Sequence, residues 1–158
     1  LLQVKFLITL FKELKKRNIP TAIDTSGMFD ITDDIKELLK FTDLVLLDIK
    51  HIDSKKCEDL VGFPNKKELA FAKYLSDNNI NIWIRQVLIP GITDDEKDLL
   101  KLKDFISTLK TVKNIEINPY HELGKFKWEK LGLKYPLEGV RPADSNDVTS
   151  AKKILGIE

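Results

Sequence analysis

The chain has 158 residues, enough for one domain with a core of its own, and no linker divides it. Hydrophobic residues make up 42% and charged residues 32%, which is typical of a soluble globular protein rather than a disordered one. Because 26 Lys and Arg residues nearly balance 25 Asp and Glu residues, nothing favours nucleic acid or a membrane as partner. One cysteine, Cys57, excludes an internal disulfide and, with two histidines, a usual zinc site. These features favour the cytoplasm.

The first half of the chain alternates between predicted helices and strands. Residues 1–17 place apolar side chains at helical spacing, and their apolar part, residues 1–11, is too short to span a bilayer. A strand is predicted over 21–24, a helix over 33–40 capped by Thr32, and a buried strand over 44–49. Asp53 then opens a helix-like segment that contains Cys57.

The second half continues this order. Asn65 with Glu68, and Thr93 with Glu96, are spaced to start helices, the second pair as a capping box. Strands are predicted over 81–89 and 114–118, and a last helix begins at 145 or 146 and ends near 155. The connection 119–144 is longer than ordinary loops, which favours a functional role.

Helix–strand alternation predicts a parallel sheet with crossover helices, as a single α/β domain over residues 1–158. Two architectures have this pattern, an open doubly wound sheet and an arc of a (β/α) barrel, and we favour the arc. The first helix has no strand before it, although a crossover helix normally connects two strands. We therefore expect the N-terminal strands of the barrel to be missing from this chain.

Polar side chains occur where each predicted strand ends. In parallel sheets these ends share one edge, where ligands bind. The residues in question are Asp24, Thr25, Asp48, Lys50, Arg85, Asn118 and His121. A pocket of mixed charge suits a zwitterionic ligand, because Lys and Arg engage a carboxylate while Asp accepts from an ammonium or coordinates a cation.

Simpler explanations exist for the same residues. Asp24 and Asp48 could equally cap loops or form ion pairs with Lys50 and Arg85. Arg85 lies in an apolar strand, so its charge must be paired or face a cavity. A lone histidine is more often structural than a ligand, and a lone cysteine is more often structural than reactive.

The lysine-rich run over residues 125–130 also contains Phe126 and Trp128. It suits a solvated loop or a protein-docking surface better than stacking on nucleic acid.

Several strings resemble the pyruvate formate-lyase activating enzyme family, in the family's order and over nearly the whole chain. They are DTSG at 24–27, TDLVLLDIK at 42–50, FAKYL at 71–75, WIR at 83–85 and NPYHELGKFKW at 118–128. The last string is the most specific. The resemblance implies a partial (β/α) TIM-like barrel of the radical SAM type.

In that family a [4Fe–4S] cluster binds S-adenosylmethionine (SAM) and cleaves it reductively, with a reductant such as flavodoxin. The resulting 5′-deoxyadenosyl radical abstracts hydrogen from a glycine of the partner, a glycyl-radical enzyme such as pyruvate formate-lyase. Position by position, the resemblance implies SAM contacts at Asp24, Asp48, Lys50, Arg85, Val87 and His121. It also implies a monovalent-cation site made by Asp24, Thr25, Leu46 and Asp48, with Leu46 contributing its backbone carbonyl.

Two features of the family have no counterpart here, the CxxxCxxC motif that holds the cluster and a Gly-Gly-Glu segment. One cysteine cannot supply the thiolates that a cluster needs, so the cluster belongs to the full-length parent only. We expect this chain to be the C-terminal portion of the activase, inactive alone and without catalytic residues of its own. The alternatives are an activase for another glycyl-radical enzyme and a noncatalytic module that binds a ligand or a protein.

Overall fold

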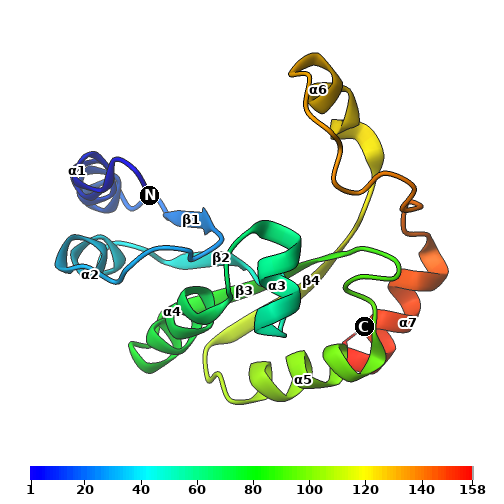
Figure 1. The fold of residues 1–158 in the computed structure, drawn as a ribbon. Coiled ribbons are helices and arrows are strands. Elements are labelled where there is room, and N and C mark those ends of the chain that lie inside the picture. Colours follow the sequence, from blue (N-terminus) through cyan, green and yellow to red (C-terminus); the bar gives the residue numbers. More distant parts are fainter. Residues whose placement is uncertain (158) are drawn as a thin grey trace.

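The computed structural model describes residues 1–157 (Figure 1). Helices and strands follow one another in the predicted order from α1 to β4. The elements are α1 (Val4–Lys16), β1 (Ala22–Thr25), α2 (Asp33–Leu39), β2 (Leu44–Asp48), α3 (Ser54–Val61), α4 (Lys66–Asp77), β3 (Asn81–Leu88), α5 (Glu96–Ser107), β4 (Val112–Pro119), η1 (Glu122–Gly124), α6 (Lys125–Lys130) and α7 (Ser145–Leu155). No helix among residues 1–157 is long and apolar enough to cross a membrane.

The four strands form one parallel sheet in the order β1-β2-β3-β4. Asp24 pairs in register with Leu46, and Asp48 pairs with Arg85. All four strands therefore end at the same edge of the sheet. The prediction of a parallel α/β fold is confirmed.

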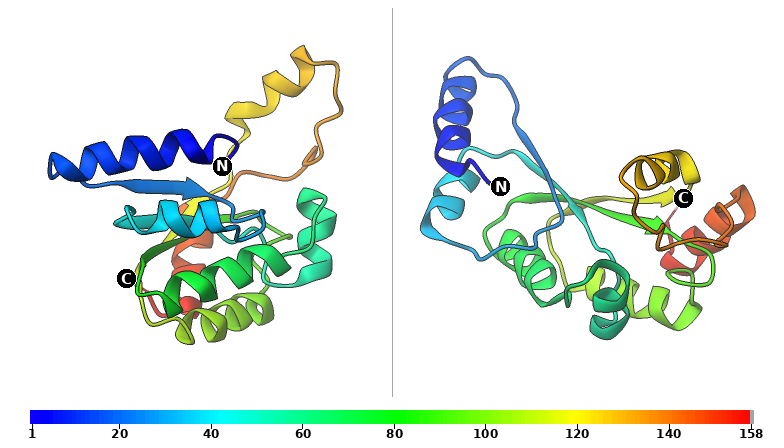
Figure 2. Two further views of the ribbon diagram at one scale, coloured as in Figure 1. Left: turned by 90° about the vertical axis from the view of Figure 1, so that its left-hand side faces the viewer. Right: turned by 45° about the horizontal axis from the view of Figure 1, so that its top comes forward.

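The two faces of the sheet differ in their cover. Alternate strand residues point into the helical layer and are at most 7% exposed; they are Ile23, Val45, Leu47, Ile82, Ile84, Leu88 and Ile117. The residues between them, such as Trp83 and Arg85 on β3, point to the opposite face and are more exposed. Figure 2 shows helices α2, α4, α5 and α7 following the curve of the sheet on one side. A doubly wound sheet would have helices on both faces, so the barrel arc is the better description.

The helix starts follow local capping chemistry, with two corrections. Thr32 accepts a hydrogen bond from the Ile35 N–H, as predicted. The predicted capping box at Thr93 is wrong, because α5 starts two residues later with Asp95 as its N-cap. The Thr93 hydroxyl is instead buried, where it accepts from the Ile89 N–H and donates to the Val87 carbonyl.

Asn65 precedes α4, but its side chain makes no cap hydrogen bond. Its amide donates to the carbonyls of His51 and Ile52 at 2.9 and 2.7 Å. The side chain thus fixes the segment after β2, the strand that carries Asp48. A buried tertiary partner outcompetes the local cap here.

The long connection after β4 is a folded arm, which we define as residues 121–143. It contains η1 and α6 and projects from the rest of the molecule (Figure 1). Its base is fixed by Tyr120, whose N–H donates to the Leu88 carbonyl and whose carbonyl accepts from the Ala143 N–H, both at 3.0 Å. The arm is therefore anchored at both ends to one residue beside β3.

Candidate functional site

The predicted strand-end side chains meet on the open face of the sheet. Asp24 is the last residue but one of β1, Asp48 ends β2, and Lys50 follows Asp48 by two residues. Arg85 lies on β3 directly opposite Asp48. Because residues two apart on a strand point to the same side, the register brings Asp24, Asp48 and Arg85 together. Lys50 joins them through its ion pair with Asp48. We call these four side chains the strand-end quartet.

Arg85 is the centre of the quartet. Its Nε donates to Asp48 Oδ1 at 2.9 Å, and its Nη2 donates to Asp24 Oδ1 at 2.5 Å. Lys50 Nζ donates to the other Asp48 oxygen at 2.8 Å. One guanidinium therefore links the carboxylates of β1 and β2, while Lys50 supplies a second cation.

Exposure decides which of these groups can still bind a ligand. The side chains of Arg85 and Asp48 are 18% and 22% exposed, whereas that of Asp24 is 61% exposed. Burial alone would lower the pKa of Arg85, but the adjacent Asp24 and Asp48 carboxylates outweigh it and raise that pKa. Arg85 is therefore a permanent cation. Within the described chain, its Nη1 and the second oxygen of Asp24 have no hydrogen-bond partner.

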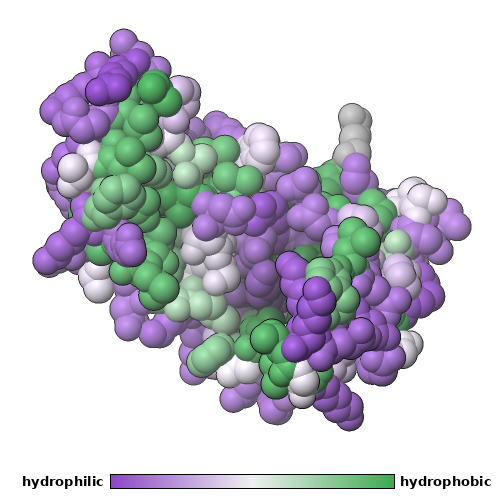
Figure 3. Space-filling view, turned by 90° about the horizontal axis from the view of Figure 1, so that it is seen from above, coloured by the Kyte–Doolittle hydropathy of each residue, from purple (hydrophilic) through white to green (hydrophobic). Residues whose placement is uncertain are grey.

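The ion-pair explanation and the ligand explanation of these residues are thus compatible. The Asp24–Arg85–Asp48 pairs hold the quartet in place, while the unpaired donor and acceptor remain available to a zwitterion. Seen from above, the open face has hydrophilic side chains in a hollow between more apolar surfaces (Figure 3).

The other predicted contacts lie on neighbouring positions of the same strands. Val87 is two residues after Arg85 on β3 and half-buried. Leu46 pairs in register with Asp24. Thr25 ends β1, and its hydroxyl accepts from the Gly27 N–H at 3.1 Å. The backbone thus places all three beside the quartet.

His121 is not joined to the quartet. It lies at the start of the arm and is exposed, and its Nδ1 accepts from the Leu123 N–H at 3.4 Å. No hydrogen bond or ion pair among residues 1–157 connects it to Asp24, Asp48 or Arg85. Its predicted role as a SAM contact stays a prediction.

The structure adds residues that the sequence analysis did not single out. Glu116 on β4 lies opposite Arg85 in the register and is exposed on the open face. Alternation along β4 was the available signal, because Asn114, Glu116 and Asn118 occupy every second position.

Glu68, in the first turn of α4, is the second addition. Its side chain is 0% exposed, and neither carboxylate oxygen has a hydrogen-bond partner among the described residues. Burial raises the pKa of Glu68 to about 8, although the Lys50 backbone N–H, which lies nearby without the geometry of a full hydrogen bond, and the Lys50 charge both oppose this rise. Its Cα lies 3.3 Å from the place where a Cβ on Gly27 would stand, so Glu68 packs beneath the loop after β1.

The chain's donor set does not fit an iron–sulfur cluster. Cys57 is fully buried in α3, and burial raises the pKa of its thiol to about 11. A cluster requires several thiolates, and Cys57 is the only cysteine. No group of three or more His, Cys, Asp or Glu side chains within residues 1–157 is arranged to hold a metal ion.

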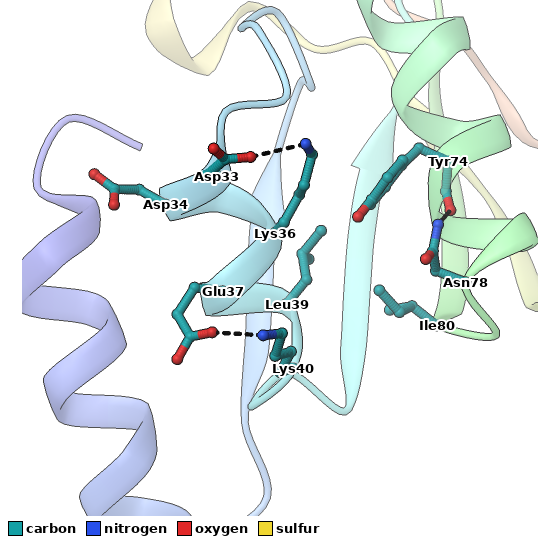
Figure 4. Close-up of a pocket in the computed structure, with 9 residues that line it drawn as sticks. All are labelled: Asp33, Asp34, Lys36, Glu37, Leu39, Lys40, Tyr74, Asn78 and Ile80. Carbon is teal, nitrogen blue, oxygen red and sulfur yellow. Dashed lines mark hydrogen bonds and ion pairs between the residues drawn. The ribbon is translucent and has the colours of Figure 1, made fainter.

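A separate groove lies outside the strand-end edge. It runs between α2 and α4 and is lined by Asp33, Asp34, Lys36, Glu37, Leu39, Lys40, Tyr74, Asn78 and Ile80 (Figure 4). None of the predicted site residues lines it. Its charged groups are largely paired with each other, as in Lys36–Asp33 at 2.9 Å and Lys40–Glu37 at 2.8 Å.

Solved structures of low sequence identity share this fold. A domain of pyruvate-formate lyase-activating enzyme from Bacteroides vulgatus superimposes with a TM-score of 0.80 at 22% identity, covering 98% of this chain and 86% of that one. Streptococcus suis SuiB bound to S-adenosylmethionine gives a TM-score of 0.66 at 19% identity, covering 94% of this chain and 32% of SuiB. This chain shares the fold of both proteins, here as an open arc, because the described strands do not close a barrel.

Curated sequences identify the relatives more narrowly. Pyruvate formate-lyase-activating enzyme of Staphylococcus epidermidis is 51% identical over 160 aligned positions, covering 98% of this chain and 64% of the relative. The enzyme of Streptococcus mutans is 46% identical over 162 positions, covering 99% and 62%. No family model matches the chain. The chain is homologous over nearly its whole length to pyruvate formate-lyase-activating enzymes, as its motifs predicted, and spans somewhat less than two thirds of theirs.

Proposed function

We propose that this chain contributes the SAM-binding strand ends of a pyruvate formate-lyase-activating enzyme. The strand-end quartet carries the proposal. It combines an unpaired guanidinium N–H, a lysine ammonium and an accessible carboxylate oxygen at the ligand-binding edge of a parallel sheet. These groups match the carboxylate and ammonium of SAM's methionine part.

Each residue has a defined task in this proposal. Lys50 and Arg85 hold the ligand's carboxylate, and Asp24 accepts from its ammonium. Asp48, already bonded to both cations, positions them and does not need to contact the ligand. Val87 offers an apolar contact to the adenosyl part, and His121 reaches the ligand from the start of the arm. Asp24, Thr25, Asp48 and the Leu46 carbonyl would bind a monovalent cation beside the carboxylate.

The [4Fe–4S] cluster, when bound to an activase, supplies the electron for SAM cleavage. Because Cys57 is the chain's only cysteine, the cluster's ligands would come from outside these 158 residues. We infer that this chain alone assembles no cluster and has no activase activity. The activase of which it is part would act in the cytoplasm with a reductant such as flavodoxin.

The partner in this proposal is pyruvate formate-lyase, and an activase for another glycyl-radical enzyme is the nearest alternative. The test is an enzyme that joins this chain to a segment with a three-cysteine cluster motif. With reductant and SAM, it should form 5′-deoxyadenosine and a glycyl radical on pyruvate formate-lyase, detected by electron paramagnetic resonance. Formation of 5′-deoxyadenosine without that radical would indicate a different partner. The absence of both, in a preparation that contains the cluster, would favour the noncatalytic module.

A further inference from the structure

The arm presents large apolar side chains to solvent. Leu123 is 76% exposed, Leu131 71%, Leu133 55% and Phe126 48%. All four lie within eleven consecutive residues of one projecting element (Figure 1). Scattered exposed apolar residues are ordinary, but their concentration on one element marks an interaction surface.

The arm is a folded support for these side chains. The hydroxyls of Tyr120 and Tyr135 lie 2.7 Å apart, and the Tyr135 ring packs edge-to-face against Trp128 with centroids 6.0 Å apart. Lys125 Nζ donates to Glu138 at 2.8 Å, which ties α6 to the returning part of the arm. A surface that is already ordered loses little conformational freedom on binding.

The charge around the apolar side chains selects the partner's chemistry. Between residues 125 and 134 the arm has four lysines and one glutamate. Lys127 and Lys134 have no ion-pair partner among residues 1–157, while Lys130 lies over the Phe126 ring at 5.3 Å. A complementary surface would have an apolar centre edged by carboxylates.

The position of the arm links it to the site. It begins at His121, directly after the carboxyl end of β4, at the same edge of the sheet as Arg85. A macromolecular partner that brings a reacting group to this edge must approach beside the arm.

We propose that residues 123–134 of the arm form the docking surface for the partner protein, through an apolar patch edged by acidic side chains. This inference rests on the proposed function, because it takes pyruvate formate-lyase as that partner. A protein is favoured over an anionic membrane because the chain's net charge is only +1 and the arm's basic side chains alternate in sequence with exposed apolar ones.

The test measures binding of the whole chain to purified, immobilised pyruvate formate-lyase by surface plasmon resonance. Phe126→Ser with Leu131→Ser should weaken binding at least about tenfold, as expected for central apolar contacts. Lys127→Glu with Lys134→Glu should mainly slow association and reduce its salt dependence. The matched control is Ile19→Ser with Leu100→Ser, which removes exposed apolar side chains outside the arm and should leave affinity unchanged. Circular dichroism confirms that each variant folds.

The outcomes separate the two proposals. Wild-type binding that the arm variants retain in full would overturn the docking surface and leave the proposed partner intact. No wild-type binding would contradict pyruvate formate-lyase as partner, and the docking inference with it. Binding to phosphatidylglycerol vesicles that the arm variants abolish, without binding to the enzyme, would assign the arm to a membrane instead.

Discussion

The pKa of the buried Glu68 carboxyl predicts how the free energy of unfolding changes with pH. Its pKa rises from an ordinary 4.5 to about 8 in the folded chain, because the side chain is fully buried and nearby Lys50 offsets only part of the cost of burying its charge. Between these two values the unfolded chain releases the proton while the folded chain keeps it. The contribution of the neutral Glu68 carboxyl to the free energy of unfolding is therefore fully present below pH 4.5. It is lost as the pH rises towards 8.

The size of the effect follows from linkage. Each pH unit above the unfolded pKa costs about 1.4 kcal/mol until the folded pKa is reached, so the loss at pH 7 is roughly 3 kcal/mol. Glu68→Gln has nearly the same shape and does not ionise. We expect this variant to be more stable than wild type by roughly that amount at pH 7, and by much less at pH 5.

The assay is urea unfolding followed by circular dichroism at pH 5, 6, 7 and 8, for wild type and Glu68→Gln. The difference between the two free energies of unfolding at each pH isolates the effect of Glu68, because the two proteins share every other titrating group. Glu129→Gln, at an exposed position on α6, is the control and should follow wild type at every pH. If the free energies of unfolding of wild type and Glu68→Gln changed with pH in the same way, the Glu68 charge would have a partner in the folded chain. That result would refute the reasoning.

Three further predictions concern the loop at Gly27, the absence of cluster-binding thiolates and self-association. Gly27→Ala should destabilise the chain by about 2–4 kcal/mol in urea unfolding, because Gly27 has φ +69 and a Cβ there would lie 3.0 Å from Leu47; Gly124→Ala, in open space, should have little effect. Anaerobic reconstitution should leave the chain without iron by elemental analysis, and a stable cluster would contradict the argument that one cysteine cannot supply its thiolates. Sedimentation velocity should show dimers or larger species, since β1 is an edge strand and Phe6 on α1 is 61% exposed; a monomer at high concentration would count against this.

The sequence predicted the fold well because its signals were local. Period and length identified all four strands and the helices between them, and parallel pairing then implied a common edge for the strand-end residues. The quartet followed from this, since Asp24, Asp48 and Arg85 are brought together by register alone.

Two of the misses come from tertiary partners that compete with local signals. Thr93 and Asn65 resemble helix caps in sequence, but their polar groups serve buried backbone of other segments. Helix α6 has six residues, too few for a periodic pattern. The burial of Glu68 depends on its packing against the loop at Gly27, about forty residues away, which no local pattern reports.

The central claim is that the strand-end quartet binds SAM, and calorimetric titration of SAM tests it most directly. The measurement uses the cluster-containing enzyme with Lys50→Met, and with Lys127→Met as a matched control on the arm, after iron content is checked. Loss of a partly desolvated charge-assisted hydrogen bond should weaken binding by roughly 1.5–3 kcal/mol in Lys50→Met, about ten- to a hundredfold. Lys127→Met should bind like wild type. Equal small effects in both variants would show that Lys50 only forms an ion pair with Asp48.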